Sequence, residues 1–408
     1  MRSITTVLPR AQHPRSGRAL RGPRPIVTIG AAVSLLGPTL TAGAQTASFQ
    51  ALGVLGNAQA STPNACSADG TTVVGSSAIG SSTKAFQWRR ETGMTAVPIP
   101  ISTTYAQADA ASADGSIIVG SYRNPTLPMA FRWEQGSAMA VPLGHLPGGT
   151  FSVARECSDD GMVIVGEANT TSGVRAYRWN NGAFEILGLL PNATESTAIA
   201  VSADGSTVAG YCLVNGQRRA FRWTAALGTH ELPLPPGMTA STARAVSADG
   251  SVVAGECGTG SAFHAFRWTA ATGTKDLGVL SGQPSASAYR VSADGSVIVG
   301  YSAPGASTGA FLWRQDLGMV DLKGYLTDLG GNLSGWTLGL ASGISADGKT
   351  ITGWGRHTIA PGVVRDEAWM ATLGSAPCYA NCDGSTSAPV LNVNDFTCFM
   401  NKYAAGCP

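Results

Sequence analysis

The sequence predicts an all-β fold, a seven-bladed β-propeller with four-stranded antiparallel blades, followed by a small disulfide-stapled C-terminal module. Three observations predict it: a unit of about 45 residues occurs seven times, each unit offers four short strands, and a spare strand precedes the first unit. Four strands in about 45 residues match one propeller blade. An open β-solenoid is the alternative, but its coils are usually shorter and it needs no spare strand.

Two motifs define the unit. The first is Ser-Ala-Asp-Gly or a close variant, followed by a β-branched run that ends in Gly; successive Asp residues are 45, 46, 44, 45, 45 and 53 residues apart. The second is Ala-Phe-x-Trp or a close variant, whose Ala follows the turn Asp by 16 residues in six copies. The turn aspartates are Asp69, Asp114, Asp160, Asp204, Asp249, Asp294 and Asp347.

Each unit supplies its strands in a fixed order. The first is rich in Ala and Ser, as in Ala198–Ser202, and suits inner strands that converge on an axis. The second is the β-branched run, as in Ser296–Gly300, and the third carries Phe and Trp on one face because side chains alternate. The fourth is expected at a Leu-Gly-x-Leu-like segment, such as Leu187–Leu190 or Leu277–Leu280.

The seventh unit has no fourth strand, because Ala368–Leu373 runs directly into the tail. The segment Phe49–Leu55 resembles a fourth strand and precedes the first unit. We therefore expect it to pair with the seventh blade, which closes the ring and removes two exposed sheet edges.

The seven turn aspartates invite a catalytic or calcium-binding interpretation, but a structural one is stronger. An Asp side chain accepts hydrogen bonds from backbone N–H groups two residues on, and the following Gly takes positive φ. A catalytic carboxylate is needed once or in a pair rather than in every blade. The arginines between Phe and Trp are expected to form hydrogen bonds within or between blades: Arg132, Arg178, Arg222 and Arg267.

These motifs resemble the HAF repeat family, named for a His-Ala-Phe tripeptide that stands here as His264-Ala265-Phe266. The resemblance covers about residues 49–373. It implies an extracellular protein and leaves the molecular function undefined.

Residues 1–44 read as a signal peptide. Six Arg and no acidic residue precede an apolar run, Ile26–Leu40, and Ala42-Gly43-Ala44 is a typical cleavage site. An uncleaved membrane anchor is the alternative. The remaining 21 basic and 25 acidic residues give a formal charge of −4, which argues against a nucleic-acid partner. We expect an exported monomer with no membrane span in the mature chain.

The domain boundaries follow: the repeats occupy 45–373, and 374–408 form the Cys-rich module. Four cysteines there indicate disulfides in an exported chain. Of three possible connectivities we favour the nested one, Cys378 with Cys407 and Cys382 with Cys398. The cysteines inside the repeats are expected to be buried thiols, because equivalent positions of different blades are too far apart for a disulfide: Cys66, Cys157, Cys212 and Cys257.

The module also resembles a dockerin-type calcium loop, which implies calcium as the one cofactor. The candidate ligands are Asn381, Asp383, Asn392, Asn394 and Asp395. Tyr379 at the first ligand position, an insertion over Ser385–Pro389 and the single copy depart from the pattern. The alternative is a disulfide knot with an N-cap on a helix over Phe396–Tyr403.

One position varies in chemistry while its neighbours do not, three residues before each turn Ser. Its occupants are Asn64, Asp109, Arg155, Ile199, Arg244, Tyr289 and Ser342. On inner strands these residues could face the central channel and bind a ligand, and Asn64, Asp109, Arg155, Arg244 and Tyr289 are the candidates. Packing between blades is the alternative.

No nucleophile elbow, phosphate loop or metal-ligand spacing of His appears in the sequence. We therefore expect a non-enzymatic repeat protein with a binding or structural role at the cell surface or outside the cell, recruited through its tail. Its partner would be a glycan or a cell-surface protein. The alternative is a propeller carbohydrate-active enzyme, a glycosidase or a polysaccharide lyase, since dockerin-like tails often accompany such catalysts.

Overall fold

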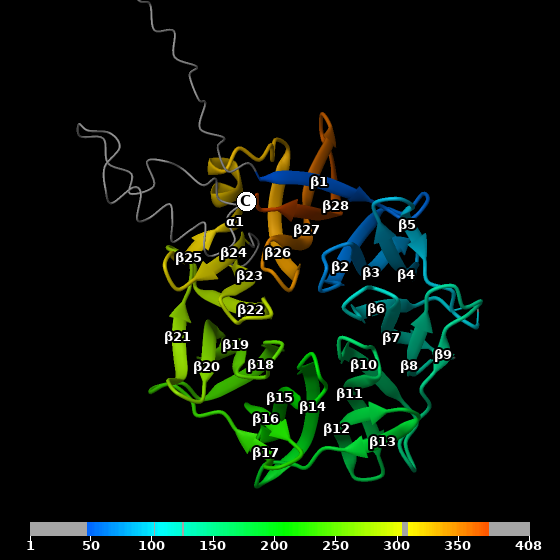
Figure 1. The fold of residues 1–408 in the computed structure, drawn as a ribbon, viewed down its shortest axis with the longest axis vertical. Coiled ribbons are helices and arrows are strands. Elements are labelled where there is room, and N and C mark those ends of the chain that lie inside the picture. The colour runs from blue at the N-terminus through cyan, green and yellow to red at the C-terminus, as the bar shows by residue number, and fades with distance from the viewer. Residues whose placement is uncertain (1–46, 102, 125, 304–308, 375–408) are drawn as a thin grey trace, which may run out of the picture. The chain divides into compact units, whose positions relative to one another are not determined.

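The computed structural model describes residues 47–374 except 102, 125 and 304–308. These residues form seven four-stranded antiparallel sheets that follow one another around a ring (Figure 1). The seven-bladed propeller expected from the repeat is confirmed. Residues 1–44, predicted as a signal peptide, and residues 375–408 of the predicted Cys-rich module lie outside the described residues.

The four strands of each blade run from the axis outward. The inner strands are β2 (Ala60–Cys66), β6 (Ala106–Ala111), β10 (Ser152–Cys157), β14 (Ala193–Val201), β18 (Ala240–Val246), β22 (Ser285–Val291) and β26 (Trp336–Ile344). The second strands are β3 (Thr72–Ile79), β7 (Ile117–Arg123), β11 (Val163–Thr170), β15 (Thr207–Val214), β19 (Val252–Thr259), β23 (Val297–Ala303) and β27 (Thr350–Ala360).

The third strands are β4 (Ser82–Arg89), β8 (Pro128–Glu134), β12 (Gly173–Asn180), β16 (Gln217–Thr224), β20 (Ala262–Thr269), β24 (Gly309–Arg314) and β28 (Val363–Thr372). The outer strands are β5 (Gly93–Ala96), β9 (Val141–Pro142), β13 (Ala183–Ile186), β17 (Gly228–Glu231), β21 (Gly273–Gly278), β25 (Gly318–Asp321) and β1 (Ser48–Gly53). We number the blades from one (β2–β5) to seven (β26–β28 with β1).

The ring closes through the N-terminal strand. β1 pairs antiparallel with β28, from Ser48 opposite Thr372 to Gly53 opposite Ala368. In Figure 1 the blue β1 lies beside the orange β28, although the two are at opposite ends of the described chain. The predicted closure is confirmed, with a strand that ends at Gly53 instead of Leu55.

The expected position of the fourth strand was wrong in blade three and only partly right in blade five. In blade three the outer strand is Ala183–Ile186, and the Leu187–Leu190 segment follows it. Leu187 and Leu190 are buried in the core between blades three and four. In blade five, β21 includes Leu277 but ends at Gly278. The outer strand lies at the rim of the ring, so the two leucines are buried only where the chain turns inward to the next blade.

A short helix accounts for the longest spacing between turns. α1 (Leu322–Asp328) lies between β25 and β26, and its N-cap Asp321 accepts a 2.7 Å hydrogen bond from the Gly324 N–H. Leu322 and Leu326 are buried in the same cluster as Leu312 and Trp369. The helix therefore packs over the joint between blades six and seven.

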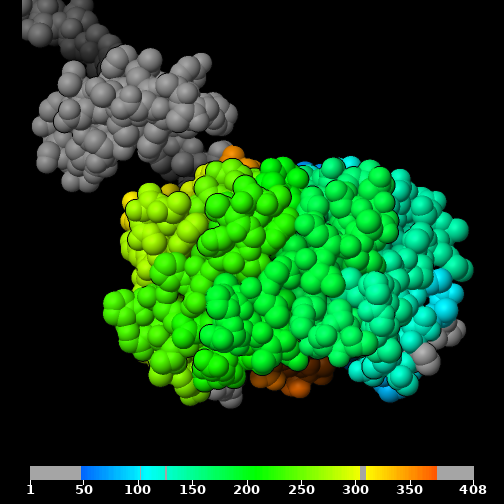
Figure 2. All heavy atoms as spheres, turned by 90° about the horizontal axis from the view of Figure 1, so that it is seen from below, coloured from blue at the N-terminus to red at the C-terminus, as the bar shows by residue number. Residues whose placement is uncertain are grey.

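The aromatic residues of the third strands form the cores between blades. Phe86, Phe131, Tyr177, Phe221, Phe266 and Phe311 are fully buried, and Trp369 takes this place in blade seven. The part of the rim seen in Figure 2 is continuous, with side chains closing the space between neighbouring blades. No helix among the described residues has the length and apolar character to cross a membrane.

Every turn aspartate has the same structural role. The Ser two residues before it donates its hydroxyl to Asp Oδ1, and the N–H two residues after it donates to the same oxygen, in all seven turns. In blade two, the N–H and hydroxyl of Ser116 and the hydroxyl of Ser112 lower the pKa of Asp114 to about 2. The structural interpretation of these residues is confirmed.

Each inner strand carries a β-bulge at the same place. The pairing with the second strand shifts between Pro63 and Ala65 in blade one, and at the equivalent step in the other six. The bulged residue is the variable residue three before the turn Ser. A bulge leaves its extra residue unpaired and redirects its side chain. The pairing of the inner strand therefore does not constrain the side chain of the bulged residue, which can differ between blades.

The glycine that ends each β-branched run makes the bulge possible. A Cβ at Gly210 of β15 would lie 1.9 Å from the Thr197 carbonyl oxygen of β14, and the other six blades have the same conflict at 1.9–2.2 Å. Only a residue without a side chain lets the inner strand approach this closely.

We predict that Gly210→Ala lowers the free energy of unfolding by about 1–3 kcal/mol or more, because the inner strand must move away. Gly188→Ala is the matched control in the same region, since its Cβ would meet only Thr229 Oγ1 at 3.7 Å. Chemical denaturation of both variants measures the difference. Equal stabilities would show that the close approach is not what selects glycine.

Candidate functional site

Seven backbone hydrogen bonds encircle the axis at the face that carries the turns, the turn face. An N–H of each turn donates to a carbonyl oxygen of the next turn, at 2.7–3.1 Å, and the last bond joins Ala346 of blade seven to Ala68 of blade one. The bonded residues are Ala68 and Asp69, Ala113, Asp159, Ala203, Ala248, Ala293 and Ala346. This ring narrows the channel at the turn face.

A cavity of about 130 Å³ lies on the axis and is lined by residues from all seven blades. Most of its lining is small or apolar, such as Ala111, Val201, Val246 and Ile344. Glu156 and Asp159 of blade three and Arg290 of blade six are the charged exceptions, since the equivalent positions in the other blades are Ala or Gly.

Glu156 and Arg290 meet across the axis. Arg290 Nη2 lies 3.5 Å from Glu156 Oε2 and donates a 3.2 Å hydrogen bond to the Asn64 carbonyl oxygen of blade one. Burial raises the pKa of Glu156, and Arg290 opposes this shift. The pair joins three blades that are not neighbours in the chain. Sequence analysis missed it, although a charged residue at a position otherwise held by Ala or Gly was a usable signal.

The bulged residues lie one residue further from the turns than this ion pair, and four of the five candidates gather in two groups. In the first group, Arg155 Nη2 lies 2.5 Å from Glu167 Oε1 of β11. The Thr197 hydroxyl of blade four donates to Glu167 Oε2 at 2.7 Å. Asp109 is next to Arg155, whose charge acts on it.

The second group lies in blades five and six. Arg244 Nη2 lies 2.9 Å from Glu256 Oε1 of β19, and its guanidinium stands 4.8 Å from the ring centroid of Tyr289. Tyr289 contacts Tyr301 edge to face, with centroids 5.7 Å apart. A cation over an aromatic ring is a favourable contact. We call the two groups together the axial site: Asp109, Arg155, Glu167, Thr197, Arg244, Glu256, Tyr289 and Tyr301.

Asn64 stands apart from the axial site. Its Nδ2 donates to the Ala108 carbonyl oxygen of blade two at 2.8 Å, and the Ser342 hydroxyl donates to the Pro63 carbonyl oxygen at 2.7 Å. Both side chains therefore connect neighbouring inner strands. Ile199 is half-buried in blade four.

Asp109 has the most unusual environment of the described carboxylates. It is 7% exposed, and burial raises its pKa to about 7 against the opposing charge of Arg155. Oδ1 accepts a 2.6 Å hydrogen bond from Gln107 Nε2, whereas Oδ2 is buried without a hydrogen-bond partner. A carboxyl group with a strongly shifted pKa and an unsatisfied oxygen is a candidate functional group.

The arginines of the third strands connect neighbouring blades, which is one of the two roles expected from the sequence. Arg132, Arg178, Arg222 and Arg267 each donate from Nε to the carbonyl oxygen of the turn Gly in the next blade, at 3.1–3.3 Å. The four repeat cysteines are free thiols. Three of them are buried, and burial raises the pKa of Cys257 to about 12, as is typical of unreactive thiols.

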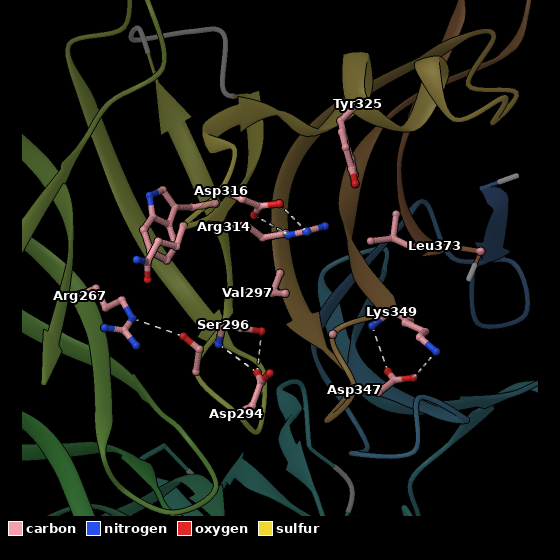
Figure 3. Close-up of a pocket in the computed structure, with 15 residues that line it drawn as sticks. Arg267, Asp294, Ser296, Val297, Arg314, Asp316, Tyr325, Asp347, Lys349 and Leu373 are labelled. Atoms are coloured by element: carbon pink, nitrogen blue, oxygen red, sulfur yellow. Dashed lines mark hydrogen bonds and ion pairs between the residues drawn. The ribbon is translucent and has the colours of Figure 1, made fainter. Parts of the chain in front are cut away.

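An open groove of about 830 Å³ lies between blades six and seven (Figure 3). Figure 3 shows Tyr325 of α1 directed towards it from one side and Asp294 and Asp347 on the other. Its charged groups are already paired: Arg314 with Asp316 at 2.8 Å and Lys349 with Asp347 at 4.0 Å. A groove of 660 Å³ with an equivalent lining lies between blades four and five. The groove is therefore a product of the repeat.

The proposed disulfides and the calcium ligands Asn381, Asp383, Asn392, Asn394 and Asp395 all lie outside the described residues. Within residues 47–374, apart from the gaps given above, no three His, Cys, Asp or Glu side chains gather in a way that could hold a metal ion.

Solved propeller structures resemble this fold. An oligogalacturonate lyase from Vibrio parahaemolyticus is 12% identical, with a TM-score of 0.52 over 80% of this chain and 97% of that one. An oligogalacturonate lyase in complex with manganese is 14% identical, with a TM-score of 0.51 over 76% of this chain and 88% of that one. TolB from Acinetobacter baumannii is 14% identical, with a TM-score of 0.45 over 62% of this chain.

This chain spans 63% of that TolB chain. No family model and no curated protein matches the sequence. Identities this low show a likeness of fold alone, so the comparisons agree with the fold described above and say nothing about its ligand.

We predict that Glu156→Gln lowers the free energy of unfolding by about 1–3 kcal/mol, because Arg290 loses its partner in a largely buried place. Arg290→Gln should cost a similar amount, and the double variant should cost less than the sum. Thermal or chemical denaturation of the four proteins measures this coupling. The exposed pair Arg314–Asp316 is the control and should couple by less than about 1 kcal/mol. Additive effects at Glu156 and Arg290 would mean that the axial pair does not stabilise the ring.

Proposed function

We propose that this chain is an exported, non-enzymatic HAF-repeat protein that binds a glycan or a cell-surface protein at the axial site. The observation that carries the proposal is where the blades differ. Seven units of one pattern vary at the bulged position, which places Asp and Arg side chains in one group near the axis and Arg and Tyr side chains in a second. A ligand site in a propeller commonly uses a few polar and aromatic side chains on a rigid frame.

The Cys-rich tail has a separate role in this proposal. It recruits or attaches the propeller through a dockerin-like, calcium-binding fold, with the residues named above as ligands. The resemblance in the sequence supports this part of the proposal. With two carboxylates among five ligands, the affinity for calcium would be in the range of extracellular modules, roughly 10⁻⁴–10⁻³ M.

The alternative is a carbohydrate-active enzyme, and one observation favours it. Asp109 has a pKa of about 7 because it is buried, and a carboxyl group that is partly protonated near neutral pH can act as a general acid. Glycoside hydrolysis also requires a second carboxylate on the other side of the bond. Glu156 and Asp159 both line the axial cavity, and Glu156, the less exposed of the two, would take this part.

We predict that Tyr289→Ala lowers binding of the labelled full-length protein to an array of glycans and cell-surface proteins at least tenfold. Tyr289 contributes its ring to the axial site and no backbone connection between blades, so its loss should leave the fold intact. Arg314→Ala in the turn-face groove is the control and should bind like the unchanged protein. Unchanged binding by Tyr289→Ala would remove the axial site. Release of reducing sugar ends from an arrayed glycan, lost in Asp109→Asn, would establish the enzyme instead.

We also predict that the full-length protein, with its disulfides intact, releases or absorbs heat when titrated with millimolar calcium, whereas a chain ending at Gly374 does not. Asp383→Asn with Asp395→Asn should reduce the heat in the full-length protein, because each change removes a carboxylate ligand. Calorimetry under matched buffer conditions measures it. The absence of any heat from the full-length protein would remove calcium from the proposal.

A further inference from the structure

The charges of the axial site are matched within the protein. Arg155 pairs with Glu167, Arg244 with Glu256, and Arg290 below them with Glu156. The Glu side chains are 10–17% exposed, so these pairs are largely removed from water. An ionic ligand would have to break one of these pairs and leave a buried charge without a partner, which is strongly unfavourable. The site is therefore better matched to an uncharged ligand.

Asp109 is the exception, because no arginine of the described residues donates a hydrogen bond to it. Tyr105 donates its hydroxyl to Gln107 Oε1 at 2.6 Å, and Gln107 Nε2 donates to Asp109 Oδ1 at 2.6 Å. This chain of hydrogen bonds fixes the carboxyl group and leaves Oδ2 as an acceptor without a donor. A buried acceptor without a partner costs free energy that a ligand donor would recover.

Tyrosine rings from several blades stand near the axis, and the charge of Asp109 acts on one of them, Tyr105. Tyr105 of blade two, Tyr211 of blade four and the Tyr289–Tyr301 pair of blade six are all half-buried. Tyr105 and Tyr211 are close enough to Arg155 to interact with its charge. Half-buried tyrosines offer an apolar face with a polar edge, which suits a ligand with C–H faces and hydroxyl edges.

We propose that the axial site binds an uncharged, hydroxyl-rich ligand, the end of a neutral glycan chain, with a ligand hydroxyl donating to Asp109 Oδ2 and a tyrosine ring under the sugar. This inference rests on the proposed binding function and specifies its ligand class. Oδ2 is covered in the ligand-free protein. Binding of the ligand therefore requires a movement of the side chains that cover Oδ2.

Asp109→Asn tests the acceptor directly. The test uses isothermal calorimetry of the full-length protein against neutral pentasaccharides of glucose, xylose, galactose and N-acetylglucosamine, with free glycerol as the simple polyol. A galacturonate pentasaccharide and spermidine are the charged comparators. We expect a neutral pentasaccharide to bind and Asp109→Asn to weaken it at least tenfold. The Tm of the variant should stay the same or rise, because a buried charge is removed. Asp316→Asn is the matched surface control.

The pH dependence supplies a readout that a structural role would not give. The groups facing Asp109 are Arg155 and Glu156 of β10, Arg290 of β22, Tyr177 of β12, and Tyr105, which directly precedes β6. Since burial raises the pKa of Asp109 to about 7, the carboxylate becomes the main form above that pH and accepts a hydroxyl better. Binding should therefore tighten from pH 6 to pH 8 in the unchanged protein and stay level in Asp109→Asn.

The outcomes separate this inference from the proposed function. Suppose that galacturonate or spermidine binds, that Tyr289→Ala abolishes this binding, and that no neutral sugar binds. The proposed ligand class would then be wrong, whereas the axial site would still be a binding site. Binding of a neutral pentasaccharide that Asp109→Asn leaves unchanged would overturn the role of Asp109. If glycerol binds as strongly as a pentasaccharide relative to its number of hydroxyl groups, the site recognises polyols in general. That result would overturn the assignment of a glycan as the ligand. If no ligand binds in calorimetry, and neither Tyr289→Ala nor Asp109→Asn reduces binding to the array, both proposals are overturned.

Discussion

The rest of this propeller depends on the seven backbone hydrogen bonds that link the turns around the axis. Each is an ordinary bond of 2.7–3.1 Å, but they form a closed circle, so no blade can move outward without breaking two of them. The circle can form only if all seven inner strands come close to the axis. Small residues on these strands, such as Ala108, Ala198 and Ala243, are completely buried there.

This close approach decides which residues the repeat must keep. The turn Ser and Asp hold the backbone that supplies the ring bonds, and the Gly of the second strand lets the inner strand in. These residues accept hydrogen bonds from backbone N–H groups or make room for the backbone. A residue that does this in every blade is not free to differ in one of them. The bulged residue of each blade has none of these repeated structural roles, so its chemical type differs from blade to blade.

The sequence was sufficient to predict the ring, its closure by the N-terminal strand and the role of the turn aspartates, because each follows from local chemistry repeated seven times. The outer strand was misplaced because its leucines are buried in the link between blades, and hydrophobicity alone does not distinguish a strand from a buried connection. The Glu156–Arg290 pair depends on which blades face each other across the axis, and spacing along the chain does not give that distance. The environment of Asp109 depends in the same way on Arg155 from the next blade.

A ring of equal blades offers a ligand several equivalent places, and the two turn-face grooves with matching linings illustrate this. Specific binding of one ligand in one orientation requires the symmetry to be broken. In a ring of seven no blade stands directly opposite another, so blade three faces the space between blades six and seven. Arg290 of blade six therefore reaches Glu156 from one side and also contacts blade one. With Asp109 and Arg155 on one side of the axis and Arg244 and Tyr289 on the other, the axis is the place where this protein departs furthest from its own repeat.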